Sequence, residues 1–270
     1  MNLELLKMLV FIIPIKSSKV ATSWPELCKL FERCLRSVCN QTSQEFRVVV
    51  ICNEKPNIEF HHSKVTYLES DFPVPKSDYL SKNIDKCKKI TVGLLSLQEL
   101  QPTHIMVVDA DDCVSRRIAS FVSQHSDENG WFVDSGYEYK DGNEIITIRR
   151  KEFYKMCGTC NIINYRLLTL PERMLPYDQL TYDRFLTGHP LARPDLAERG
   201  TPLQPLPFPG TIYVRDRIGE SISMQEPFLA KLKRDPREAM RGIKKGLLAA
   251  FNDQPLTDEI REEFGLYPLL

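Results

Sequence analysis

Three short apolar runs, separated by longer segments of helical pattern, constrain the fold of this chain more than any other feature. The runs are Met8 to Ile15, Phe46 to Cys52 and His104 to Val108, and each contains several β-branched residues. Continuous apolar runs of this length are typical of strands buried on both faces of a sheet. Because such strands need helices on both sides, the sequence predicts an α/β fold with a doubly wound sheet.

Helical periodicity follows the first run and precedes the third. Between Pro25 and Val38, apolar residues recur at intervals of three and four, and Ser23 is a candidate N-cap. Asn83 to Leu100 is predicted to be a second helix, and Val65 to Leu68 a short additional strand. The order strand, helix, strand, strand, helix, strand is that of a doubly wound sheet.

The second half of the chain has a different pattern. Trp131 to Tyr139 and Glu144 to Arg149 are predicted to form a hairpin around the Asp-Gly-Asn turn at 141–143. Asp178 to Leu186 is predicted to be helical, and the proline-rich stretch 190–210 to be an irregular loop.

The end of the chain is basic and helix-like from Pro227 to Phe251. We therefore expect a catalytic domain over residues 1–215 and a C-terminal helical extension, 216–270, that packs on it. Basic residues concentrate at 231–245, where such a helix either contacts an anionic membrane surface or packs on the domain with a solvated face; the second interpretation is simpler.

Composition excludes several classes of function. Lys and Arg total 36, as do Asp and Glu, so no net charge favours bulk binding of nucleic acid. No apolar run reaches the roughly 18 residues of a membrane-spanning helix. The apolar start lacks a basic region and a cleavage site, so we expect a cytoplasmic protein, with peripheral contact at the inner membrane face as the alternative.

The eight cysteines are scattered, and free thiols are the preferred interpretation. Only Cys157 and Cys160 have the close spacing of a redox or zinc half-site. No second pair of ligands accompanies them, which disfavours a zinc site.

Three carboxylates follow the third apolar run directly, in the segment Asp109-Ala110-Asp111-Asp112. In doubly wound sheets, ligands bind at the carboxyl ends of the strands, where this segment is expected. A divalent cation such as Mg²⁺ or Mn²⁺ would offset the repulsion between the carboxylates. An acidic turn in which Asp112 caps the next helix is the alternative.

The strand followed by VVDADD resembles the DxD region of nucleotide-sugar glycosyltransferases of GT-A fold, most closely family 2-like members. Further segments agree in order: VFIIPIKSS, RVVVICNEKP, SKNIDKCKKITVGL, WFVDSGY, GTCNIINYRLL and LPYDQLTYDRFLTGHP. The resemblance covers roughly residues 8 to 190. It implies a GT-A-type doubly wound mixed sheet flanked by helices, and a metal-dependent transferase.

The resemblance also implies roles for individual residues. Asp109 would contact the ribose or uracil side of the nucleotide. Asp111 and Asp112 would hold Mn²⁺ or Mg²⁺ on the diphosphate, and His189 is a candidate additional ligand. Residues at the end of the first strand and before the second helix are candidate contacts to the nucleotide-sugar: Pro14, Lys16, Ser17 and Lys82.

The expected reaction transfers a sugar from a nucleotide-diphospho sugar, with UDP the expected nucleotide, to a hydroxyl of a glycan, lipid-linked or small-molecule acceptor. Asp178 is the first choice for the base that deprotonates this hydroxyl, and Asp183 the second. Asp178 as base implies inversion at the anomeric carbon. Tyr177 stands where the family usually has a Glu, so retention remains open.

Two other functions are alternatives to a glycosyltransferase. A sugar nucleotidyltransferase usually has a glycine-rich loop after the first strand, but IKSSKVATSW contains no glycine. A non-catalytic carbohydrate-binding or scaffold protein with a degenerate transferase fold is disfavoured by the intact Asp109, Asp111 and Asp112, and favoured by the missing Glu beside Asp178.

Overall fold

Two β-sheets make up the strand framework of the computed structural model, which describes residues 7–76, 78–172, 189–215 and 251–269. The first sheet has the strand order β10-β6-β9-β4-β1-β2-β3. Its strands are β1 (Leu9–Pro14), β2 (Phe46–Cys52), β3 (Val65–Glu69), β4 (His104–Val107), β6 (Gly130–Phe132), β9 (Asn161–Asn164) and β10 (Gln204–Pro205). The neighbours β4, β1, β2 and β3 are parallel, whereas β9 runs antiparallel to both β4 and β6. The sheet is therefore mixed, as predicted.

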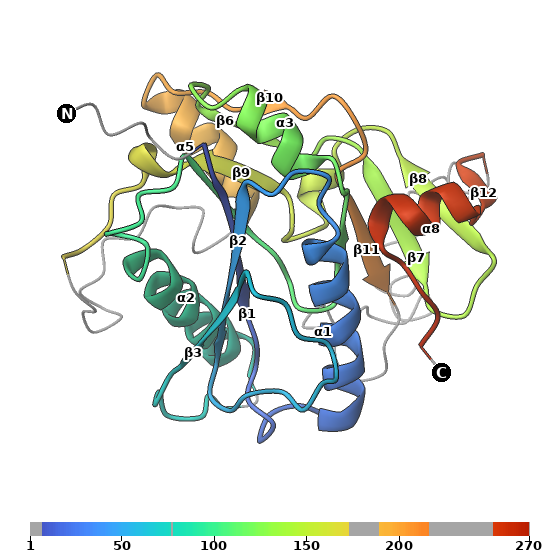
Figure 1. Ribbon diagram of the computed structural model, residues 1–270, viewed down its shortest axis with the longest axis horizontal. Coiled ribbons are helices and arrows are strands. Elements are labelled where there is room, and N and C mark those ends of the chain that lie inside the picture. The colour runs from blue at the N-terminus through green and yellow to red at the C-terminus, as the bar shows by residue number, and fades with distance from the viewer. Residues whose placement is uncertain (1–6, 77, 173–188, 216–250, 270) are drawn as a thin grey trace, which may run out of the picture.

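Helices cover both faces of this sheet (Figure 1). Because alternate residues of a strand point to opposite faces, Phe11 and Ile13 pack with α1 (Trp24–Cys39), whereas Val10 and Ile12 pack with α2 (Tyr79–Leu95). The short helix α3 (Ile118–Gln124) joins the core on the α1 side, and α5 (Ala192–Glu198) joins that on the α2 side. The predicted doubly wound arrangement is confirmed.

Close contact between α2 and the sheet depends on a glycine. A Cβ atom at Gly93 would lie 2.8 Å from a methyl group of Ile51 and 2.9 Å from one of Ile12. The missing side chain therefore lets the helix approach β1 and β2 closely enough to bury Ile90 and Leu94 between them.

Local sequence signals locate the start of the first helix but not that of the second. Ser23 caps α1 as predicted, accepting a hydrogen bond from the backbone N–H of Glu26 at 3.4 Å. The second helix, predicted from Asn83 to Leu100, runs from Tyr79 to Leu95 instead. Its start is fixed by Asp78, whose carboxylate accepts from the N–H of Ser81 at 2.8 Å.

A second sheet has the order β12-β8-β7-β11-β5 and stands beside the first in Figure 1. Its strands are β5 (Cys113–Val114), β7 (Gly136–Lys140), β8 (Ile145–Arg149), β11 (Thr211–Arg215) and β12 (Asp253–Pro255). The antiparallel pair β7 and β8 is the predicted hairpin. The predicted first strand was too long, however, because residues 131–132 belong to β6 of the other sheet and pair with β9.

The stretch 190–210 was predicted to be an irregular loop. It contains the helix α5, so that prediction is wrong for this part of the stretch. Pro194 is the third residue of this helix. A proline in the first turn costs little, because the N–H that it lacks has no partner inside the helix.

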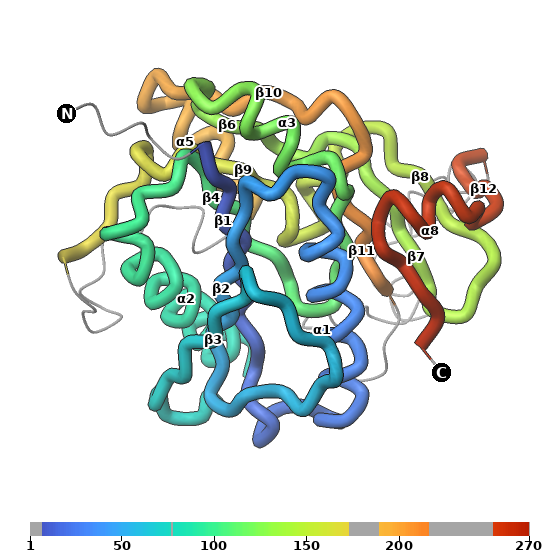
Figure 2. Tube along the Cα trace, in the orientation of Figure 1, coloured from blue at the N-terminus to red at the C-terminus, as the bar shows by residue number. Residues whose placement is uncertain are grey.

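The last described residues return to the second sheet, and their red trace in Figure 2 runs beside α1 and the β7–β8 hairpin. Strand β12 pairs with β8, and Phe264 of α8 (Asp258–Phe264) meets Tyr137 edge to face at 5.6 Å. The fully buried Arg33 of α1 donates to both carboxylate oxygens of Asp141, at 2.5 and 3.3 Å, and to the carbonyl of Tyr267 at 3.3 Å. Segment 251–269 thus closes the second sheet; the predicted boundary at 215/216 stays a prediction.

No helix in the described part of the chain is long and apolar enough to cross a membrane. The basic segment 231–245 lies outside the described residues.

Candidate functional site

The acidic turn lies at the carboxyl edge of the first sheet. Strand β4 is central, between β9 and β1, and the chain continues through Val108, whose N–H donates to the carbonyl of Ile12 at 2.9 Å. A turn follows, closed by the N–H of Asp112 on the carbonyl of Asp109 at 3.1 Å. The carboxylates therefore stand where the parallel strands β1 and β4 end together, as predicted.

Asp112 points into the protein and is 1% exposed. Its Oδ2 accepts hydrogen bonds from the Thr159 hydroxyl at 2.6 Å and the Cys157 thiol at 3.2 Å, and its Oδ1 accepts from the N–H of Val214 at 3.4 Å. Burial, followed by the charges of Asp111 and Asp109, raises the pKa of Asp112 well above its usual value. A cation that reached Asp112 would have to displace these donors, and its role as a metal ligand stays a prediction.

Asp109 is paired with a lysine that the sequence analysis did not select. The ammonium of Lys86, on α2, contacts Oδ1 of Asp109, and both side chains are 28% exposed. Burial opposes the charge of Lys86, but its pKa is raised because Asp109, Asp111 and Asp112 surround it with negative charge. Lys86 thus places a positive charge beside the acidic turn, in contact with Asp109.

The position of the Asp109 carboxylate is also set from the opposite side. Gly158 packs so closely that a Cβ atom there would lie 2.5 Å from Oδ2 of Asp109. The hydroxyl of Thr159 accepts from the N–H of Asp109 at 2.9 Å while it donates to Asp112. The Gly158–Thr159 dipeptide therefore holds two of the three carboxylates.

Asp111 is half-buried at the tip of the turn. Its charge acts on both Asp112 and Lys86, so it stands within electrostatic range of each. The structure thus gathers Asp109, Asp111 and Asp112 in one place, with Asp109 on Lys86, Asp112 in the core and Asp111 between solvent and protein.

His189 lies near this group, as the resemblance implied. Its ring nitrogen Nε2 is buried and has no hydrogen-bond partner among the described residues. Burial lowers the pKa of His189, while Asp109 acts to raise it and Lys86 to lower it further. A neutral imidazole with an unpartnered nitrogen is a competent metal ligand or hydrogen-bond partner.

A weakly held divalent cation fits this set of residues, whereas a cage made by the protein alone does not. The described residues contain no group of three or more His, Cys, Asp or Glu side chains that could hold a metal ion. Mg²⁺, however, usually binds through one or two carboxylates and completes its shell with water and substrate phosphates. Asp111 and the unpartnered nitrogen of His189 could provide the protein ligands of such a site.

The candidate nucleotide contacts at the end of β1 differ in exposure. Pro14 is the buried last residue of β1, and Lys16 is half-buried. Ser17 is 1% exposed and donates its hydroxyl to Glu54, at 3.2 Å to Oε1. Burial opposes ionisation of Glu54, but hydrogen bonds from Ser18 and Ser17 outweigh it and lower the pKa of Glu54. Glu54, which the sequence analysis did not select, thus joins the ends of β1 and β2.

Lys82 lies one helical turn before Lys86 on α2. Between Lys86 and the sheet, the buried Lys89 donates to the carbonyl of Ile15 and to Asp85, both at 2.8 Å. The bond to Ile15 holds α2 against the end of β1, the same helix from which Lys86 reaches Asp109.

The close cysteine pair is part of the scaffold around Asp112. Every cysteine is a free thiol, and Cys157 and Cys160 are fully buried. Burial raises the pKa of both thiols, which disfavours the thiolate that redox chemistry needs.

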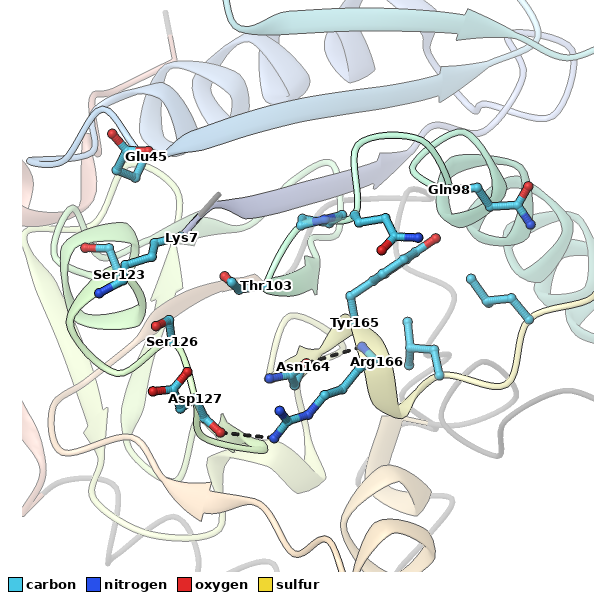
Figure 3. A pocket seen from close by; sticks show the side chains of 14 residues that line it. Lys7, Glu45, Gln98, Thr103, Ser123, Ser126, Asp127, Asn164, Tyr165 and Arg166 are labelled. Carbon is cyan, nitrogen blue, oxygen red and sulfur yellow. Dashed lines mark hydrogen bonds between the residues drawn. The ribbon is translucent and has the colours of Figure 1, made fainter. Parts of the chain in front are cut away.

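A large cavity lies at the opposite edge of the sheet from the acidic turn. It has a volume of about 1220 Å³, and Figure 3 shows its polar lining. Lys7, Glu45 and Thr103 line it just before strands β1, β2 and β4 begin. Across the opening, Arg166 donates to the carbonyl of Asp127 at 3.1 Å.

The two candidate bases, Asp178 and Asp183, lie outside the described residues. Their assignment therefore stays a prediction.

Comparisons with known proteins give a fold likeness and no family. No protein family profile and no curated protein matches the chain. A solved structure of S. aureus TarS has a TM-score of 0.41 and 14% identity, over 77% of this chain and 37% of that one. S. aureus TarS 1-349 in complex with UDP-GlcNAc has a TM-score of 0.44 and 14% identity, over 94% of this chain and 69% of that one.

A structure of 4-diphosphocytidyl-2C-methyl-D-erythritol synthase has a TM-score of 0.36 and 14% identity, over 84% of this chain and 97% of that one. The chain spans about 37% of the longer TarS structure. Structural similarity at these TM-scores and identities supports no conclusion about activity. Such a conclusion has to come from the geometry of the site.

Proposed function

We propose that this chain is a glycosyltransferase that moves a sugar from a nucleotide-diphospho sugar, with UDP the expected nucleotide, to an acceptor hydroxyl. The observation that carries the proposal is the acidic turn at the carboxyl edge of β4, with the ammonium of Lys86 placed on Asp109. Carboxylates for a ribose and a cation, beside an ammonium for a diphosphate, suit a nucleotide-diphospho ligand.

Within this proposal the residues of the turn divide their roles. Asp109 accepts hydrogen bonds from the ribose, and Lys86 gives the diphosphate a positive partner as the nucleotide leaves. Asp112 fixes the turn from inside, because its carboxylate is held by Thr159, Cys157 and Val214. A divalent ion held by Asp111 and His189 would supply Lewis-acid help to the departing diphosphate.

We assign binding of the nucleobase to the loop after β1. Lys16 is half-buried there, and Ser17 is held against Glu54. Loops after β1 and β4 lie at the same edge, since the two strands are parallel neighbours. One nucleotide could therefore contact both loops.

Asp178 remains the proposed base, with Asp183 second, and inversion at the anomeric carbon follows if Asp178 serves. A glycan, a lipid-linked molecule or a small molecule would provide the hydroxyl. A cytoplasmic location belongs to the same proposal. For the basic segment 231–245, packing on the domain remains the simpler interpretation and contact with a membrane surface the alternative.

Calorimetric titration of UDP, with and without Mn²⁺, tests the donor site. We expect binding that requires Mn²⁺ and is lost in Asp111→Ala. Asp127→Ala is the matched control, because Asp127 is an exposed carboxylate at the opposite edge of the sheet. A wild-type protein that ignores UDP in the presence of Mn²⁺ would rule out the UDP donor and direct the search to other nucleotides or to glycan binding.

A further inference from the structure

The ammonium of Lys86 stands beside the place proposed for a divalent cation at the acidic turn. It contacts Oδ1 of Asp109, while Gly158 closes the space on the Oδ2 side. The same ammonium is within electrostatic range of Asp111 and Asp112. One positive charge inside the protein therefore already offsets the repulsion for which an external cation would otherwise be needed.

Lys86 is also held in this place by its helix. Asp85 and Lys89, its neighbours on α2, are buried in an ion pair at 2.8 Å, and Lys89 is bonded to the carbonyl of Ile15. Rotation or sliding of α2 would break the bond from Lys89 to Ile15 and leave a buried ammonium with one partner fewer, which is costly. The ammonium can move by its own side-chain rotamers, but the helix keeps it within reach of Asp109.

We propose that Lys86 keeps the affinity of the free protein for divalent cations low, so that a cation binds well only once a diphosphate is present. A bound diphosphate gives the ammonium a second anionic partner and adds oxygen ligands for the cation. Nucleotide and cation thus bind cooperatively, and the cation alone binds poorly. This inference rests on the proposed function for its diphosphate, but the suppression of cation binding in the free protein does not.

The test measures Mn²⁺ binding to the full chain without nucleotide, by calorimetry or by the electron paramagnetic resonance signal of free Mn²⁺. In Lys86→Met we expect Mn²⁺ to bind at least roughly tenfold more tightly than in wild type, because a like charge beside the cation has been removed. Lys88→Met is the matched control: it removes the same charge from the same helix, where Lys88 lies over the ring of Phe72 at 5.7 Å. It should bind Mn²⁺ as wild type does.

Folding is checked in the same experiment. Lys86→Met leaves the carboxylates without their internal cation, so its melting temperature should fall and should recover when Mn²⁺ is added. If Lys86→Met alone does not fold, the double variant Lys86→Met with Asp109→Asn removes one charge of each sign and still lacks the blocking ammonium. It should also bind Mn²⁺ more tightly than Asp109→Asn alone.

Mn²⁺ binding to Lys86→Met that is no tighter than to wild type or Lys88→Met would overturn the inference. Because no nucleotide is present, that result would leave the proposed transferase untouched. Conversely, a failure of UDP to bind wild type would remove the proposed function without altering the Mn²⁺ comparison.

Discussion

Replacing Thr159 by Val should weaken the protein more than any comparable threonine substitution, because its hydroxyl serves two groups of the acidic turn. It donates to the buried carboxylate of Asp112 at 2.6 Å and accepts from the N–H of Asp109 at 2.9 Å. A hydrogen bond to a charged group contributes about 1.5–3 kcal/mol, and a buried N–H left unpaired costs about 1–3 kcal/mol. At pH values above the raised pKa of Asp112, where its carboxylate is ionised, the free energy of unfolding should therefore fall by about 3–5 kcal/mol.

The assay is urea-induced unfolding of Thr159→Val beside Thr211→Val. Thr211 is equally buried, and its hydroxyl donates to the carbonyl of Thr159 at 2.9 Å, so it makes one neutral hydrogen bond. Its loss should cost about 1 kcal/mol. Equal losses in the two variants would refute the view that the turn depends on the Thr159 hydroxyl.

The difference between the two variants should also depend on pH. The pKa of Asp112 is raised in the folded protein, so its ionised form destabilises the fold at pH values above that pKa. As the pH falls through that raised pKa, the carboxyl takes up a proton and needs fewer donors. The excess loss in Thr159→Val should therefore be smaller below the raised pKa than above it, and a loss that grew on acidification would contradict this account.

Asp141, Gly158 and His104 provide three other predictions. Asp141→Asn should lower the free energy of unfolding by about 2–4 kcal/mol in chemical denaturation, because it leaves the fully buried Arg33 without its counter-charge; an unchanged midpoint would contradict this. Gly158→Ala should abolish UDP binding in calorimetry while the far-ultraviolet circular dichroism stays native, because its Cβ displaces the Asp109 carboxylate. Burial lowers the pKa of His104 to about 4 from 6.5, so stability should fall as the pH drops from 6.5 to 4, and an NMR titration should show that folded His104 stays neutral down to about pH 4.

The central sheet could be predicted from sequence because its strands are buried on both faces. Phe46–Cys52 was predicted residue for residue, since the apolar, mostly β-branched residues that follow Arg47 are typical of a strand buried on both faces. The limits of α2 were missed because Asp78, its N-cap, lies in a stretch of prolines and polar residues with no apolar periodicity to mark a helix.

Short strands were harder to assign than long ones. The three residues of β6 and the two of β5 are too few for any period to appear, and their pairing is decided by partners far along the chain. Trp131 and Tyr137 therefore looked like one strand, although they belong to different sheets.

The acidic turn was predictable because three carboxylates directly after a buried strand are unusual. The residues that contact the turn could not be predicted. Lys82 was selected, yet Lys86 makes the contact. The two lysines lie one turn apart on the same face of α2, so their position along the helix axis decides which one reaches Asp109. Gly158 and Thr159 reach the turn from the loop before β9, the neighbour of β4 in the sheet, and nothing local in the sequence links them to it.

The contribution of β12 and α8 to the second sheet has a consequence for how the chain folds during translation. Thr147 of β8 bonds to Asp253 of β12, a partner 106 positions later. Leu256 and Phe264, which pack with the apolar residues of β7 and β8, are therefore made long after the strands themselves, and the strands lack these contacts until the ribosome has passed residue 264. A nascent chain stalled in the preceding stretch would present Tyr137 and Ile146 to chaperones, and the first sheet would be ready to fold well before the second.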